Sequence, residues 1–110
     1  AIWELQMACE KTMKAYLAQK KIDYPATHNL RELQKLASEH VDFAEAKPAM
    51  AVMPSEKRVI AWRYSELPQP KPKEFFQIYR AALMLCKIYA ERMDRKYVFN
   101  NFAVKLKRFP

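Results

Sequence analysis

The chain has 110 residues, 51% of them hydrophobic and 29% charged, which is typical of a globular domain and excludes a disordered chain. No apolar run is long enough to cross a bilayer and no secretory leader opens the sequence, so we expect a cytoplasmic protein. The formal net charge of +8 favours an anionic partner such as nucleic acid, a nucleotide or an acidic protein, with a well-solvated basic surface as the alternative.

The first predicted helix covers residues 1 to about 20. Glu10 and Lys14 are four residues apart with the acid first, which favours a surface ion pair. Cys9 and, in a later helix, Cys86 occupy apolar positions, and we interpret both as buried reduced thiols. No CxxC motif or Cys/His cluster predicts a disulfide or a metal site. The apolar stripe of this helix consists of Ile2, Leu5, Cys9, Met13, Tyr16 and Leu17.

A second helix is predicted to begin at Asn29 and to end near residue 39 or 40. Asn29 is a strong N-cap residue, and Glu32 three positions later completes a capping-box pattern. His28 comes just before the cap, where we expect it to pack on Leu33 as a staple-like contact; ligand contact is the alternative.

The segment from 41 to 70 has two interpretations. Its β-branched and aromatic residues on either side of "PSEK" are compatible with an irregular or hairpin insertion. The same residues are equally compatible with one or two helical turns that begin at Ser55.

The third predicted helix covers residues 73–97 and has an unusually wide apolar face. One row of residues follows alternating steps of three and four, and a second row lies beside it. This width indicates burial against both a core and a partner subunit. Three helices with short links predict an all-α, up-and-down helical bundle over residues 1–110. The first row is Phe76, Tyr79, Leu83, Cys86, Ala90, Met93 and Tyr97; the second is Phe75, Ile78, Ala82, Leu85 and Tyr89.

Two features describe the chain as a whole. Seven Lys or Arg residues stand against two Asp or Glu residues between Lys87 and Arg108, so this segment holds +5 of the net +8. We interpret the basic tail 98–110 as a phosphate-attracting arm or a solubilising end. The chain also contains no glycine, which is frequent in turns, so we expect that loops or an end of the native chain are missing.

The stretch "ACEKTMKAYLAQKKIDYPATHNLRELQKLA" (8–37) resembles the HEPN family of nucleotide-binding helical domains. "WRYSE" (62–66) resembles the Arg-Tyr that precedes that family's last long helix, and 73–97 fits that helix. The resemblance covers most of residues 1–97, and it implies that a helix which usually precedes the Glu-Lys helix in the family is absent or lies outside this chain. The matching positions in the first stretch are Ala8, Glu10, Lys11, Lys14, Ala15, Thr27, His28, Asn29, Leu30 and Leu33.

The resemblance implies a homodimer through the 73–97 helix. It also implies a nucleotidyltransferase partner, as in toxin–antitoxin or defence-like systems, and a nucleotide or RNA ligand. Some family members are metal-independent ribonucleases that carry Arg, four to six residues, then His on the last helix. Here Arg92 is followed by Tyr97 where the His would stand, and Tyr is a poor base at neutral pH. Catalysis by Arg92 and Tyr97 is therefore the alternative to binding without cleavage.

We predict a HEPN-type nucleotide- or RNA-binding module that needs no cofactor or metal. The alternatives are a ribonuclease and a purely structural dimerisation domain. Arg63 beside Tyr64 is suited to grip a phosphate while the ring stacks on a base, although Tyr64 is as readily a core or interface anchor. The candidate binding residues are Lys11, Lys14, Arg58, Arg63, Tyr64, Arg92 and Arg95.

Overall fold

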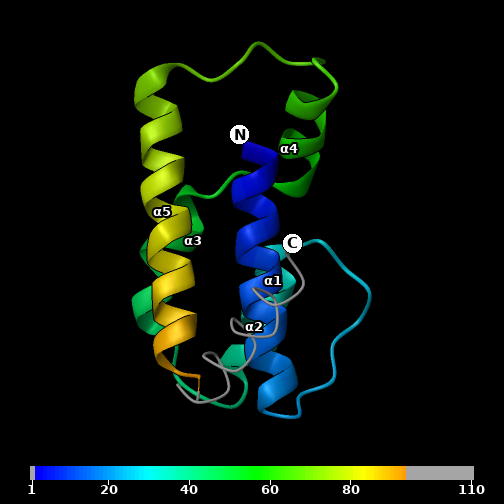
Figure 1. Cartoon of the computed structure of the whole chain (residues 1–110), viewed down its shortest axis with the longest axis vertical. Helices are drawn as coiled ribbons and strands as arrows, with labels where there is room; N and C mark the ends of the chain where they lie inside the picture. The colour runs from blue at the N-terminus through cyan, green and yellow to red at the C-terminus, as the bar shows by residue number, and fades with distance from the viewer. Residues whose placement is uncertain (1, 94–110) are drawn as a thin grey trace, which may run out of the picture.

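The computed structural model describes residues 2–93, which fold into helices joined by turns and contain no strand (Figure 1). The predicted all-α bundle is therefore confirmed. No helix in this range is both long and apolar enough to span a membrane. The elements are α1 (Ile2–Gln19), α2 (Leu30–Ser38), the short 3-10 helix η1 (Ala44–Ala46), α3 (Lys47–Val52), α4 (Glu56–Arg63) and α5 (Pro72–Glu91).

The two long helices, α1 and α5, lie side by side and run in the same direction (Figure 1). Cys9 contacts Ala82 and Cys86, and Tyr16 contacts Tyr89, so residue numbers rise together along both helices. The short helices between them carry the chain back. Among these, α4 packs antiparallel to α1, because Arg63 at its end lies against Trp3 at the start of α1.

Short sequence signals set the helix starts. The Asn29 side chain accepts hydrogen bonds from the backbone N–H groups of Arg31 and Glu32 and caps α2. The Glu32 carboxylate accepts from the Thr27 hydroxyl at 3.0 Å and forms no bond to the cap's own N–H among the described residues. Ser55 caps α4 by accepting from the N–H of Arg58. The hairpin interpretation of 41–70 is therefore wrong, and the helix beginning at Ser55 is confirmed.

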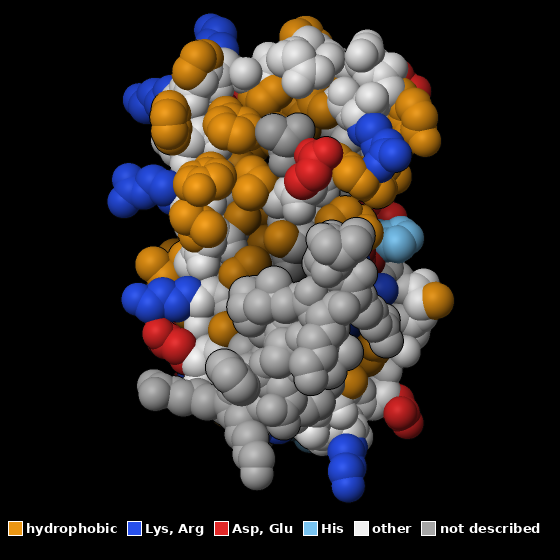
Figure 2. Space-filling view, in the orientation of Figure 1, with side chains coloured by type: hydrophobic (Ala, Val, Ile, Leu, Met, Phe, Trp, Pro, Cys, Tyr) orange, Lys and Arg blue, Asp and Glu red, His pale blue; other side chains and the backbone are white. Residues whose placement is uncertain are grey.

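Helix α5 buries most of its second apolar row, whereas the first half of its first row is exposed. Ile78, Ala82, Leu85 and Tyr89 from the second row are buried. In the first row Phe76, Tyr79 and Leu83 are 63%, 41% and 52% exposed. Figure 2 shows hydrophobic side chains gathered along α5 on this face, bordered by Lys and Arg. The exposed side chains Phe76, Tyr79, Leu83 and Met84 are called the α5 face below.

The helix also ends earlier than predicted. Its last residue is Glu91, and Arg92 is the C-cap, so the expected helix over 73–97 is too long at residues 92 and 93. Tyr97, Arg95 and the tail 98–110 lie outside the described residues.

Candidate functional site

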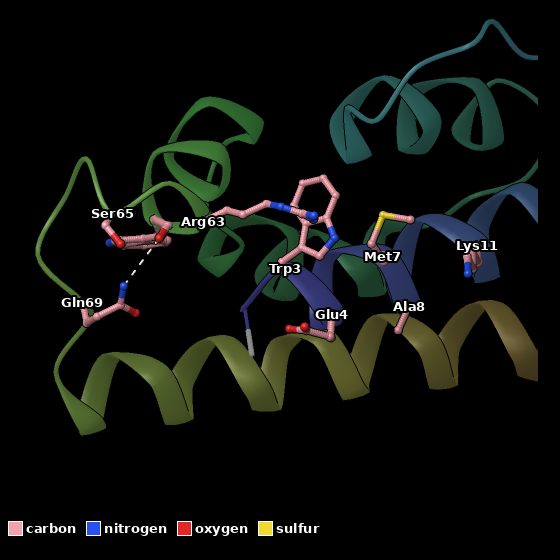
Figure 3. Close-up of a pocket in the computed structure, with 9 residues that line it drawn as sticks. Trp3, Glu4, Met7, Ala8, Lys11, Arg63, Ser65 and Gln69 are labelled. Carbon is pink, nitrogen blue, oxygen red and sulfur yellow. Dashed lines mark hydrogen bonds between the residues drawn. The ribbon is translucent and has the colours of Figure 1, made fainter.

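An open groove of about 920 Å³ lies between the first half of α1, the end of α4 and the connector that follows α4. Figure 3 shows its residues: Trp3 and Arg63 form one wall, and Lys11 stands farther along α1. Glu4 lies between Trp3 and Lys11 on α1. The charged lining residues Glu4, Lys11 and Arg63 give the groove a net charge of +1.

The Arg63 guanidinium lies 4.1 Å from the centre of the Trp3 ring. A cation over an indole face is attracted by the ring quadrupole, so the contact restricts where the guanidinium can lie. The planar guanidinium carries five N–H donors around its edge, the geometry that suits a phosphate or carboxylate. The sequence predicts that the Tyr64 ring stacks on a base, with a core or interface anchor as the alternative; Tyr64 is 67% exposed and is therefore no core anchor, and the ring that packs on Arg63 is Trp3.

The connector after α4 is held in shape by Trp62. Its indole N–H donates to the carbonyl of Pro68 at 2.9 Å. Gln69 returns a hydrogen bond from its amide to the Trp62 carbonyl at 3.5 Å, the dashed line in Figure 3. Ser65 sits at the turn with a φ of 59°, a left-handed conformation that reverses the chain directly after Arg63. These contacts hold the connector, which supplies Ser65 and Gln69 to the lining of the groove.

The two lysines that the sequence predicts as ligand-binding residues, Lys11 and Lys14, have different surroundings. Lys11 is exposed and lines the groove. Lys14 pairs with Glu10 at 3.2 Å and lies 5.8 Å from the centre of the Tyr24 ring, so its charge is already matched. Only Lys11 of the two is placed to meet a ligand in the groove.

Arg58 lies outside the groove lining and has partners of its own. It donates to the Glu74 carboxylate at 3.0 Å, which joins α4 to α5. Its guanidinium also covers the Trp62 ring at 4.6 Å. This arginine therefore packs on Trp62, which lines the groove, without lining the groove itself.

Arg92 lies at the opposite end of the bundle from α4, because it follows the end of α5 (Figure 1). It pairs with Glu45 and stacks 4.4 Å from the centre of the Phe43 ring. It closes an aromatic cluster in which Phe43 stacks on Tyr89 at 4.7 Å and Tyr16 meets both rings edge-on. The structure thus does not bring Arg92 together with Arg63 in one chain.

Sequence reasoning did not single out Glu10 as a buried group. Its side chain is only 3% exposed, and it pairs with both Lys14 and the Nδ1 atom of His28. The His28 side chain is 62% exposed and its Nδ1 atom meets this carboxylate, a polar contact that the sequence did not predict; the staple on Leu33 stays a prediction. Gln6 adds a hydrogen bond to the His28 carbonyl at 3.1 Å. The THN segment is thereby fastened to α1.

The spacing of Glu10 and Lys14 predicts one contact of this network, although it predicts that contact as a surface ion pair. The pair exists, but it lies under the connector that precedes α2. Glu10 is surrounded by His28 of that connector and by residues of α4, and spacing along α1 does not specify either neighbour.

Comparison with known proteins gives one positive result. The model of the HEPN domain family matches residues 1–93. No curated protein and no solved structure matches the chain. The match covers the groove, the Glu10 network and the whole of α5.

Proposed function

Because the chain belongs to the HEPN family, we propose that it binds a nucleotide or single-stranded RNA in the groove between α1 and α4. The observation that carries this proposal is the Arg63 guanidinium stacked on Trp3, with Lys11 in the same groove. The two cations supply charge for phosphate, and the aromatic lining supplies apolar surface for a base or ribose. A volume of about 920 Å³ is within the range of small-molecule sites.

The experiment is a titration with ATP and with a short single-stranded oligoribonucleotide at two salt concentrations. We expect Arg63→Ala and Lys11→Ala each to weaken binding about tenfold, because each removes one charge-assisted interaction. The slope of log affinity against log salt should fall by about one for each cation that no longer meets a phosphate. Lys35→Ala, an exposed lysine on α2, is the matched control and should bind as the wild type does.

Absence of binding at the lower salt concentration would contradict the proposal. So would an equal weakening in the Lys35→Ala control, since that result would make the attraction a property of net charge. Gel analysis of the RNA in the same samples tests the ribonuclease alternative. Arg92 already pairs with Glu45 and packs on Phe43, so the described residues lend that alternative no support.

A second copy of the chain is the proposed occupant of the α5 face. Phe76, Tyr79, Leu83 and Met84 lie on one exposed side of the longest helix, and family resemblance implies association through this helix. A nucleotidyltransferase, in a toxin–antitoxin or defence-like setting, is the further partner that the resemblance implies. Copurification of the chain with the product of an adjacent nucleotidyltransferase gene tests that part.

A further inference from the structure

The only two cysteines of the chain meet across the α1–α5 interface. The sulfur atoms of Cys9 and Cys86 are 3.9 Å apart although 77 positions separate them in sequence. Cys9 is fully buried and its thiol donates to the carbonyl of Ala82 at 3.6 Å, whereas Cys86 is half-buried. Both thiols are free in the structure.

The helices are close enough here for a covalent bond. The contact between the Cys9 sulfur and the backbone of α5 requires close approach, which the small side chain of Ala82 permits. An S–S bond is about 2 Å long, so the sulfurs must move together by about 2 Å. Rotation about the Cα–Cβ bonds of the two cysteines moves the sulfurs without moving the helix axes.

The two thiols are chemically unequal. A hydrogen bond with Cys9 lowers the pKa of Cys86, against the effect of burial. The same hydrogen bond, together with burial, raises the pKa of Cys9. Because the thiolate is the nucleophile, Cys86 is the group that reacts first with an oxidant.

We propose that Cys9 and Cys86 form a reversible intramolecular disulfide when the protein meets hydrogen peroxide. The Cys86 thiolate attacks one peroxide oxygen, the O–O bond breaks, and the departing hydroxide takes a proton to leave as water. The sulfur of Cys9 then attacks the Cys86 sulfenic acid and displaces its oxygen, which leaves as a second water with the Cys9 proton. Two thiols are oxidised and one peroxide is reduced to two water molecules.

The bond would tie α1 to α5 in the interior of the bundle. It closes a loop that contains α2, α3 and α4, and a crosslink of long span restricts the unfolded chain. The oxidised protein should therefore unfold at a higher temperature than the reduced protein. This effect is independent of any ligand in the groove.

The test treats the reduced wild-type chain with one equivalent of hydrogen peroxide and maps its peptides without reductant. We expect a single crosslinked peptide that joins Cys9 to Cys86, a rise of several degrees in thermal midpoint, and reversal of both by dithiothreitol. Cys86→Ala should leave the buried Cys9 thiol unreacted over the same time. Cys9→Ala removes the hydrogen bond that lowers the Cys86 pKa, so Cys86 should form the sulfenic acid more slowly and without a disulfide, and a dimedone probe captures the acid that forms.

Three results would overturn the proposal. They are a disulfide between Cys86 residues of two chains, sulfinic acid at Cys86 with Cys9 still free in the wild type, and no consumption of thiols. The peptide map of the wild type decides between these outcomes without reliance on the folding of either variant.

Discussion

Glu10 is a buried carboxylate with partners from two directions. Lys14 reaches it from one turn farther along α1, and His28 reaches it from the connector before α2. An ionised group removed from water is costly unless charge or hydrogen bonds replace the lost solvent. Both partners are side chains of the motif that carries the family resemblance. The motif therefore has a structural role here: it attaches the connector to α1.

The buried hydroxyl of Tyr89 makes the stability of the core dependent on pH. This hydroxyl donates to Gln34, and burial, reinforced by the neighbouring Tyr16, raises its pKa above the ordinary value. The folded chain thus keeps a proton that the unfolded chain releases near pH 10. The resulting stability is complete below that pH and is lost as the pH rises above it.

We expect the free energy of unfolding of the wild type to fall between pH 9 and pH 11 by up to about 1.4 kcal/mol per pH unit for this group. Tyr89→Phe should be less stable at neutral pH, because Gln34 loses its donor, but should show a shallower alkaline decline. Urea unfolding at several pH values measures both effects. Tyr64→Phe, at a ring that is 67% exposed, is the control. Parallel declines in wild type and Tyr89→Phe would contradict the assignment.

At the scale of the element, two helices end without the residue that usually ends them. Lys21 after α1 and Ser65 after α4 have φ values of 58° and 59°, in the left-handed region that favours glycine. The N–H of Ile22 donates to the carbonyl of Leu17 at 2.9 Å, and the N–H of Glu66 donates to that of Ala61 at 2.8 Å. These bonds close the helix ends and hold both residues in place.

Lys21→Gly should stabilise the protein by about 1 kcal/mol. The substitution removes the steric cost of a Cβ atom in the left-handed region, which stabilises the folded chain. Glycine also has more conformational freedom in the unfolded chain, and this effect cancels part of the stabilisation. Lys20→Gly is the matched control, because its backbone does not have a positive φ, and it should destabilise. Chemical denaturation of the two variants decides the sign. A decrease in stability in Lys21→Gly would show that its side chain has a role of its own.

At the scale of the whole molecule, the distribution of apolar surface distinguishes two sides of α5. One side packs on α1 and on the short helices, whereas the α5 face is open to solvent. Large exposed side chains grouped on one helix mark an association surface more often than a solvated one. The groove proposed for ligand binding is lined by α1, the end of α4 and the connector after α4, and none of the four side chains of the α5 face lines it.

Leu83→Glu should convert a dimer into a monomer, because it places a charge in the middle of the α5 face. Its thermal midpoint as a monomer should change little, since Leu83 is 52% exposed. Sedimentation equilibrium gives the mass, and Val41→Glu, at an apolar side chain that is 47% exposed in the segment between α2 and η1, is the control. A wild type that is monomeric at micromolar concentration, or a Leu83→Glu variant that stays dimeric, would refute association through this face.

The class of fold, the family, the bounds of α1 and α2 and the start of α5 are all predictable from the sequence. Asn29 and Ser55 specify helix starts through hydrogen bonds within three residues, and the periodic apolar residues specify helix type. These signals are local, so they are readable from the chain alone. The family resemblance, which rested on the order of such segments, is confirmed over residues 1–93.

Tertiary packing determines which groups contact each other. It places Trp3 on Arg63, buries Glu10 beneath His28, holds Arg92 in the aromatic cluster and sets Cys9 beside Cys86. It also determines which apolar residues of α5 are buried. Periodicity in the sequence identifies both rows but does not indicate which row faces the core. Each of these contacts joins residues far apart in sequence, and their distances depend on how whole helices pack rather than on any local propensity.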